Sequence, residues 1–217
     1  IYVCSLAVLA ALLFAAGGSS AAPLYGCEAG AGLTENAPAN PHSARVLSWN
    51  QLLNSELYDN DREKLEQVNR FFNQFEFVSD SAQWGREDYW ATPHELLKSG
   101  LGDCEDIALS KYISLRCLGV SVQRLRLTYT LALKLNKAHM VLVFLPERQQ
   151  DPLILDNLTS DIRPASSRRD LVPVYSFNDD SLWLNRQHGE DERVGDSSRI
   201  KAWNELRARI RADAGAP

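Results

Sequence analysis

Apolar residues recur with helical spacing in the first half of the chain. Between residues 61 and 77, five apolar side chains would share one stripe of a helix, namely Leu65, Val68, Phe71, Phe72 and Phe75. The segment from Arg45 to Leu57 carries a shorter pattern of the same period. An aromatic stripe is typical of a packed core, and also of a groove that receives a partner. The pattern therefore predicts two helices, with core packing as the favoured role of the stripe.

Two further helices are marked by their termini. Residues 92–95 read Thr-Pro-His-Glu, which combines a capping threonine, a proline at the first helical position and a glutamate three residues after the cap. Gly100 is suited to end this short helix. A central helix is predicted to begin near Asp103 and to end at Cys117, shortly before Gly119.

The pattern changes to strands after the central helix. The segments 122–133, 138–145 and 153–156 are rich in Val, Leu, Ile and Tyr, as strands are. Beyond Pro173 the chain becomes polar, and residues 198–211 predict a closing helix. This order of helices first, one central helix and then strands favours an α+β fold over an alternating α/β fold.

Composition narrows the functional classes. The 217 residues include 23 Lys and Arg against 28 Asp and Glu, which gives a net charge of −5. A mildly acidic chain is a poor candidate for a nucleic-acid binder, because such proteins usually carry a basic face. The 5 Trp, 7 Tyr and 7 Phe provide enough apolar surface for a folded core and argue against disorder.

The N-terminal segment has the composition of an export signal. Residues 3–16 form an apolar run of about 14 residues, followed by small residues up to Ala22. This run is shorter than the roughly 20 residues that cross a bilayer. The sequence predicts a signal peptide over residues 1–22, a flexible arm over 23–44 rich in Ala, Gly, Pro and Asn, and one domain over 45–217. An uncleaved anchor is the alternative for the apolar run.

Cysteine usage adds a constraint. Three cysteines follow the predicted signal, and an odd number in an oxidising compartment leaves at least one free thiol. Cys104 and Cys117 would lie about 20 Å apart on one helix, too far for a disulfide. Cys117 would also face away from Cys104, so we expect it in the core.

Three residues are candidates for nucleophilic catalysis. Cys104 begins the central helix, where backbone N–H groups and the helix dipole stabilise a thiolate. His139 lies at the start of one predicted strand and Asp156 at the end of the next. A thiol needs a base, and an imidazole needs a carboxylate to fix its tautomer. Each residue could instead have a structural role: Cys104 in the core, His139 as a hydrogen-bonded histidine within a strand, and Asp156 in a turn. Spacing alone does not decide between these structural roles and the catalytic ones.

The residues around these candidates resemble a known family. Residues 102–106 read Gly-Asp-Cys-Glu-Asp, 138–141 read Ala-His-Met-Val and 155–157 read Leu-Asp-Asn. With residues 88–93 and 175–178, these segments are similar, in the same order, to the bacterial transglutaminase-like cysteine proteinases. The resemblance covers about residues 46–184. It implies an α+β fold with a papain-like or transglutaminase-like core, in which the nucleophile helix packs on an antiparallel β-sheet.

The resemblance also implies roles and a metal. Cys104 would be the nucleophile, His139 the general base and then acid, and Asp156 the orienting carboxylate. Family members bind calcium through the acidic residues that flank the nucleophile, here Asp103 and Glu105. Calcium takes about 6 to 8 oxygen ligands, so others must come from elsewhere. Asp80 and Asp88 are candidates for these further ligands. Helix capping is the alternative role of Asp103 and Glu105, and because Asp106 has the same two possible roles it is not counted among the ligands.

The function implied by the resemblance is specific. Such enzymes are periplasmic, depend on calcium and cleave a large cell-surface adhesin near its N-terminus at a pair of alanines, which releases cells from a biofilm. An inner-membrane receptor for cyclic di-GMP sequesters them. Two other functions fit the same residues, namely a transglutaminase-type acyl transferase and a non-catalytic calcium-dependent binding module. The Cys104 backbone N–H is one expected oxyanion donor, and Trp84 is a candidate for another.

Overall fold

The computed structural model describes residues 25, 27, 40–147, 150–186 and 191–213. The predicted signal peptide and most of the predicted arm lie outside these residues. Within the described ranges, no helix combines the length and the apolarity needed to span a bilayer. The first helix begins at Pro41, within the predicted arm, because Asn40 caps it and Pro41 occupies its first position.

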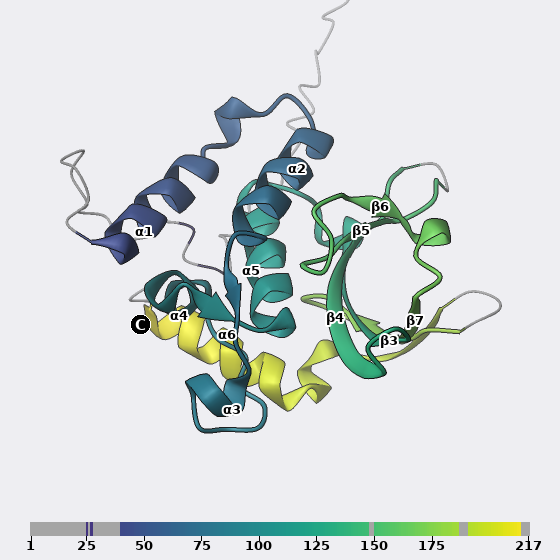
Figure 1. The fold of residues 1–217 in the computed structure, drawn as a ribbon. Coiled ribbons are helices and arrows are strands. Elements are labelled where there is room, and N and C mark those ends of the chain that lie inside the picture. The colour runs from purple at the N-terminus through teal and green to yellow at the C-terminus, as the bar shows by residue number, and fades with distance from the viewer. Residues whose placement is uncertain (1–24, 26, 28–39, 148–149, 187–190, 214–217) are drawn as a thin grey trace, which may run out of the picture.

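Helices form one half of the molecule (Figure 1). Their bounds are α1 Pro41–Leu52, α2 Asp61–Phe72, α3 Asp80–Gln83, α4 Pro93–Ser99, α5 Cys104–Cys117 and α6 Lys201–Asp213. The expected capping box is present in α4: the Thr92 side chain accepts from the Glu95 backbone, and the Glu95 side chain from the Thr92 backbone. Gly100 ends this helix with a φ of 77°, the left-handed conformation that glycine adopts without strain.

Strands form the other half, in one curved antiparallel sheet (Figure 1). Their order is β6-β5-β4-β3-β7-β8-β9. Their bounds are β3 Leu125–Ala132, β4 Lys137–Phe144, β5 Leu153–Leu155, β6 Arg163–Pro164, β7 Leu171–Phe177, β8 Leu182–Leu184 and β9 Glu192–Gly195. A separate parallel pair joins β1 (Glu76–Phe77) to β2 (Leu101–Gly102), which leads into α5.

The central helix α5 packs between the other helices and the sheet (Figure 1). Its residues 106–115 are all buried. They share one core with Leu65 and Phe72 of α2 and with Met140 and Leu142 of β4. The aromatic stripe of α2 therefore packs into the core, as its spacing favoured. The architecture is the α+β arrangement predicted from the sequence, with a helix that begins at Cys104 packed on an antiparallel sheet.

The C-terminal third differs from the expectation. Residues after Pro173 do not form a polar tail before the last helix, because β7 continues to Phe177 and β8 and β9 follow it. These strands lie at the outer end of the sheet, and β8 and β9 are only partly buried. Outer strands of this kind carry few apolar residues in alternation, so they give a weak sequence signal.

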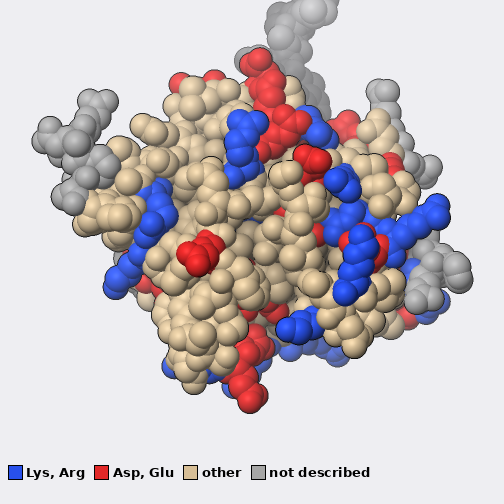
Figure 2. Space-filling view, in the orientation of Figure 1, with Lys and Arg blue, Asp and Glu red and all other residues tan. Residues whose placement is uncertain are grey.

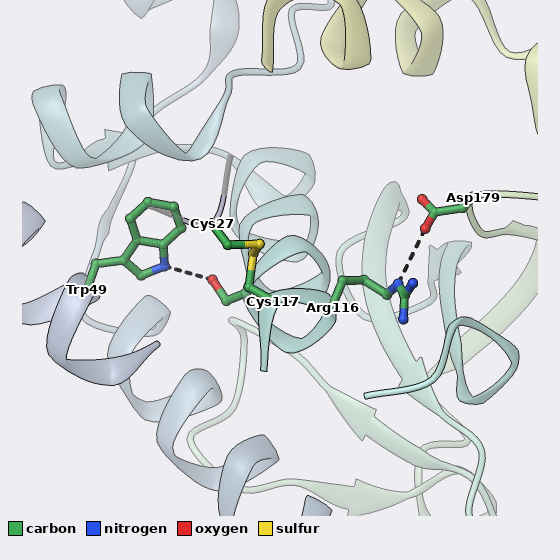
Figure 3. The surroundings of a disulfide bond; sticks show 6 residues. Cys27, Trp49, Arg116, Cys117 and Asp179 are labelled. Atoms are coloured by element: carbon green, nitrogen blue, oxygen red, sulfur yellow. Dashed lines mark hydrogen bonds and ion pairs between the residues drawn. A yellow bond between two sulfur atoms is a disulfide. The ribbon is translucent and has the colours of Figure 1, made fainter. Parts of the chain in front are cut away.

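A disulfide joins Cys27 to the C-terminal end of α5 at Cys117 (Figure 3). The expectation that Cys117 is simply a core residue is therefore wrong. Cys27 lies in a segment without periodicity, so its partner was not evident from the sequence. Cys104 is the free cysteine among the described residues, in agreement with the odd cysteine count.

The same region contains a buried aspartate. Asp179 forms an ion pair with Arg116 of α5 at 3.3 Å (Figure 3) and accepts a hydrogen bond from the Tyr25 hydroxyl. Its backbone N–H donates to the Tyr112 hydroxyl at 3.0 Å. Tyr25 is 2% exposed, so the chain next to Cys27 packs against the domain. Tyr25, the turn after β7 and α5 thus meet at one place.

Charged side chains of both signs share the face shown in Figure 2. Lys and Arg gather on the strand side, with carboxylates among and beside them, and uncharged surface covers much of the rest of this face. A continuous basic track of the kind that binds nucleic acids is not visible on the described part of this face, which agrees with the net charge.

Candidate active site

The Cys104 thiol lies at the first position of α5, where the chain enters the helix from β2. Asp103 caps the helix, because its Oδ1 accepts from the backbone N–H groups of Glu105 at 3.1 Å and Asp106 at 3.3 Å. A Cβ at Gly102 would lie 2.9 Å from Asp106 Oδ2. The glycine thus allows the turn to pack closely against the helix start and fixes where Cys104 emerges.

Carboxylates and backbone surround the thiol. Cys104 Sγ donates to Glu105 Oε2 at 2.7 Å, and the Met140 backbone N–H donates to the sulfur. Glu105 is itself held by the Tyr129 hydroxyl, which donates to Oε1 at 3.2 Å. Burial raises the pKa of the Cys104 thiol well above its usual range, and the charge of Glu105 raises it further. The thiol is therefore protonated in this arrangement.

His139 and Asp156 form a buried pair. His139 is the third residue of β4, and its backbone carbonyl accepts from Thr130 of β3 at 2.8 Å. Its Nε2 lies 2.7 Å from Oδ1 of Asp156, the residue that follows β5. Since an ionised carboxylate only accepts, Nε2 carries the hydrogen and Nδ1 is the nitrogen free to exchange a proton. Asp156 thereby fixes the tautomer of the imidazole.

Arg168 completes the surroundings of Asp156. Its Nη2 donates to Asp156 Oδ2 at 2.7 Å, and its Nε donates to Asp170 Oδ1 at 3.0 Å. Burial alone would raise the pKa of Asp156, but hydrogen bonds from His139, the Leu158 backbone and Arg168 outweigh it and lower the pKa to about 2. Asp156 is therefore ionised at neutral pH. Nothing in the sequence singles out Arg168, which belongs to a short basic pair with Arg169.

The three candidates come from neighbouring elements. Asp156 and His139 are in direct contact, and the backbone of Met140, the residue after His139, contacts the Cys104 sulfur. A thiol–imidazole hydrogen bond is not formed in this arrangement, because the thiol donates to Glu105. Catalytic hydrogen bonds are often loose without substrate and tighten in the complex.

A cluster of three carboxylates lies beside the helix start. One ligand atom from each of Asp80, Asp103 and Asp106 falls within 4.8 Å of the others. Burial, followed by repulsion from neighbouring carboxylates, raises the pKa of Asp103 to about 9. Burial likewise raises the pKa of Asp106 to about 7. Closely spaced hard oxygen ligands in a partly buried site fit a calcium ion better than they fit a softer metal.

The cluster differs in part from the set expected from the sequence. Asp103 belongs to it, whereas the expected second ligand, Glu105, directs its carboxylate to Cys104 and Tyr129. Asp80 joins the cluster and Asp88 does not. Asp106, which was not counted among the ligands on sequence grounds, belongs to this cluster and also to the capping box of α5. The spacing of an N-cap aspartate and an acidic residue three positions later is the signal that brings these two carboxylates together.

Trp84 is positioned at the end of α3, with its ring 4.8 Å from that of Tyr89. Its Nε1 is buried and has no hydrogen-bond acceptor among the described residues. A buried indole N–H without an acceptor is unusual and marks a donor that is available to another group.

Comparisons with known proteins show what the chain is similar to. The sequence model of the bacterial transglutaminase-like cysteine proteinase family, BTLCP, matches residues 42–190. The EGTA-treated structure of Legionella pneumophila LapG is 43% identical over 79% of this chain and 90% of its own, with a TM-score of 0.71. Calcium-bound LapG from the same organism is also 43% identical, over 79% of this chain and 92% of its own, with a TM-score of 0.68. No curated protein sequence matches the chain.

Proposed function

This chain belongs to the bacterial transglutaminase-like cysteine proteinases and is a LapG-like cysteine protease, and on that premise we propose that it is a calcium-dependent endopeptidase of the periplasm. Its proposed substrate is the N-terminal region of a large cell-surface adhesin, cleaved at a pair of alanines. The cleavage releases the adhesin and promotes dispersal of a biofilm. The His139–Asp156 pair beside the first residue of α5 is the observation that carries the catalytic part of this proposal.

The proposed mechanism uses Cys104, His139 and Asp156. His139 takes the thiol proton through Nδ1, since Nε2 is held by Asp156. The sulfur attacks the carbonyl carbon before the scissile bond, and the imidazolium then protonates the departing amine. His139 next takes a proton from water, whose oxygen attacks the acyl-enzyme and breaks the bond to sulfur. The acid is released, and His139 returns the proton to the Cys104 sulfur. Asp156 stays ionised throughout and stabilises the imidazolium.

The oxyanion formed during these steps needs hydrogen-bond donors. The backbone N–H of Cys104 belongs to the first turn of α5, where amides lack helical partners. The unpaired indole N–H of Trp84 is a second candidate donor from the chain before the helix. Both groups precede or begin α5, opposite the strand that supplies His139.

Calcium is proposed to bind at Asp80, Asp103 and Asp106. A related structure is described as calcium-bound and another as EGTA-treated, and the carboxylate cluster provides the donor type that calcium prefers. Bound calcium would neutralise the crowded carboxylates next to the helix start. The three residues would hold the turn that precedes Cys104 against α3, so their role is to fix the position of the nucleophile.

The proposed regulator is an inner-membrane receptor that senses cyclic di-GMP and sequesters the protease. This proposal and the periplasmic location rest on similarity to LapG-type enzymes and on the export signal expected over residues 1–22. Nucleic acid is not a proposed partner, because the chain carries a net charge of −5.

Cleavage of a purified N-terminal adhesin fragment that contains the dialanine site tests the function. The mature protein is expected to cut the fragment once in the presence of calcium and not in excess chelator, with a new N-terminus identified by mass spectrometry. Crosslinked or amine-modified products would instead establish acyl transfer. Stoichiometric binding without new termini would establish a binding module.

Replacement of Asp106 by asparagine is expected to weaken calcium binding by about 10-fold to 100-fold, because it removes a charged ligand without changing the size of the side chain. The matched variant Glu105→Gln is expected to change the affinity by only about 3-fold, since Glu105 acts on the cluster through its charge at a longer distance. Isothermal titration with calcium measures both. Equal losses of calcium affinity in the two variants would show that Glu105 is a calcium ligand.

Substitution of Arg168 by methionine is expected to lower kcat by about 10-fold, because Asp156 then loses one of the two side chains that fix its carboxylate. The neighbouring exposed residue supplies the control, since Arg169→Met removes the same charge from the surface. Steady-state kinetics on the adhesin fragment checks both variants. An Arg168→Met enzyme as active as Arg169→Met would show that Asp156 is positioned without Arg168.

A further inference from the structure

The lysine of α5 is buried and lies close to the catalytic elements. Lys111 is 1% exposed and follows Cys104 by seven residues, which is about two helical turns, so both residues lie on the same side of the helix. Buried lysines are rare unless their ammonium group is paired. The proposed chemistry does not use Lys111, and its burial therefore calls for another explanation.

Two asparagines of the α2 region accept its hydrogen bonds. Lys111 Nζ donates to Asn69 Oδ1 at 2.8 Å and to Asn73 Oδ1 at 2.6 Å. An ammonium group has only donors, so both amide oxygens must point at it. The Nδ2 groups are then turned away from Lys111. The lysine thus selects one of the two orientations that each amide group has available.

The amide nitrogens hold the loop that follows β5. Asn73 Nδ2 donates to the backbone carbonyl of Asp156 at 2.9 Å and to that of Thr159 at 3.0 Å. Asn69 Nδ2 donates to the carbonyl of Ser160 at 3.0 Å. In the reversed orientation each amide would place an oxygen against a carbonyl oxygen, which is repulsive. The amide orientation that Lys111 requires is therefore the same orientation that binds the loop 156–160.

The loop carries the carboxylate that orients the imidazole. Asp156 has its backbone carbonyl bound by Asn73 and its Oδ1 bound to His139 Nε2 at 2.7 Å. Oδ1 also accepts from the Leu158 backbone at 3.0 Å, within the same loop. A displaced loop would move the carboxylate relative to the ring, and a misplacement of about 1 Å can cost about 100-fold in rate.

We propose that Lys111 is a positioning residue, which fixes the loop 156–160 through Asn69 and Asn73 and thereby holds Asp156 in register with His139. The inference rests on the proposed protease function. It gives α5 a second role, because the helix that presents the nucleophile also sets the position of the carboxylate. The loop is tied to the helix through side chains of a third element, α2.

Kinetics of Lys111→Met test the inference. This variant keeps the length of the side chain and loses the ammonium donors. We expect kcat on the adhesin fragment to fall by about 10-fold to 100-fold with KM changed by less than about 2-fold, because the role proposed for Lys111 is to position Asp156 and not to contact substrate. Asn73→Ala is expected to act in the same way, and the double variant to be no worse than either single one, because both act through one contact.

Lys64→Met is the matched control. Lys64 lies on α2, the helix that carries Asn69. Its Nζ donates to the backbone carbonyl of Leu118, at the end of α5, at 2.9 Å. It therefore bridges the same two helices without contact to the loop 156–160. Its replacement is expected to leave kcat within about 2-fold of the wild type. A folded Lys111→Met enzyme that behaves like Lys64→Met would overturn the inference.

A second readout does not depend on cleavage. Nitrogen-15 NMR of the His139 imidazole is expected to show the hydrogen fixed on Nε2 in the wild type, and a mixture of tautomers in Lys111→Met and Asn73→Ala. A tautomer that stays fixed in both variants would contradict the inference. If the wild type fails to cleave the fragment while the tautomer responds to Lys111→Met, the proposed function is wrong and the positioning role stands.

Discussion

Replacement of Cys104 by alanine is expected to lower kcat/KM for adhesin cleavage by about 10⁴-fold or more, the largest effect we expect from any single substitution. In the proposed mechanism the Cys104 sulfur is the atom that forms the acyl-enzyme, and we expect no neighbouring group to replace it. Glu105, the nearest carboxylate, is held by Tyr129 and is a much weaker nucleophile than a thiolate. The remaining rate would come from substrate binding and from the oxyanion donors alone.

The measurement is single-turnover cleavage with enzyme in excess, which detects small residual rates. Ser110→Ala is the control, because Ser110 is fully buried in the same helix and its hydroxyl has no hydrogen-bond partner among the described residues. This variant is expected to keep wild-type activity. A folded Cys104→Ala protein that retains more than about 1% of the activity would show that another residue is the nucleophile.

Loss of the disulfide is expected to lower the free energy of unfolding by about 4.6 kcal/mol, a large part of the stability of a domain of this size. Cys27 and Cys117 are 90 residues apart in the sequence, so the crosslink removes much of the chain entropy of the unfolded state. The segment around Tyr25 would also be free to leave its site on Asp179. The double variant Cys27→Ser, Cys117→Ser tests this without a reducing agent.

Urea unfolding followed by tryptophan fluorescence gives the free energies. The wild type in dithiothreitol should unfold with the midpoint of the double variant, and the reagent should leave the double variant itself unchanged. The matched variant Cys104→Ser changes a cysteine that is not crosslinked and should differ from the wild type by less than about 1 kcal/mol. A double variant as stable as the wild type would mean that the crosslink contributes nothing to the free energy of unfolding.

The sequence predicted those features that depend on local patterns. The capping residues of α4 and the start of α5 follow from residue types at fixed offsets, and the structure has both. The abundance of Val, Leu, Ile and Tyr in β3 and β4 also predicted strands, and both strands are central in the sheet and largely buried. The helix boundaries are less well defined in the sequence: α2 ends at Phe72, five residues before the apolar pattern does.

Features that depend on contacts between distant segments could not be predicted in the same way. Arg168 reaches Asp156 because β6 and the turn after it return beside β5, and nothing in the basic pair shows this. Asn73 appears as an ordinary polar residue at the end of α2, and its contact with the loop after β5 spans 83 residues. The partner of Cys27 was hidden for the same reason.

Asp106 is an intermediate case. Its spacing from Asp103 is visible in the sequence and indicates a capping box, which the structure contains. The approach of Asp80 to within 4.8 Å is not visible there, because it depends on how α3 folds against the turn before α5. The spacing of Asp103 and Asp106 thus fits both a helix cap and a cation site. Only the position of the third carboxylate, that of Asp80, distinguishes the two.

The crosslink between Cys27 and Cys117 also determines when a newly made chain would reach its full stability. A cystine forms in oxidising compartments and is kept open in a reducing cytosol. A newly made chain would therefore lack about 4.6 kcal/mol of its final stability until it is oxidised. Since the crosslink ends on the helix that begins with Cys104, a chain that has not been exported would hold its nucleophile on a less stable helix. Oxidation after export would then act as the last step of assembly, and would delay full proteolytic competence until the protease reaches the compartment of its substrate.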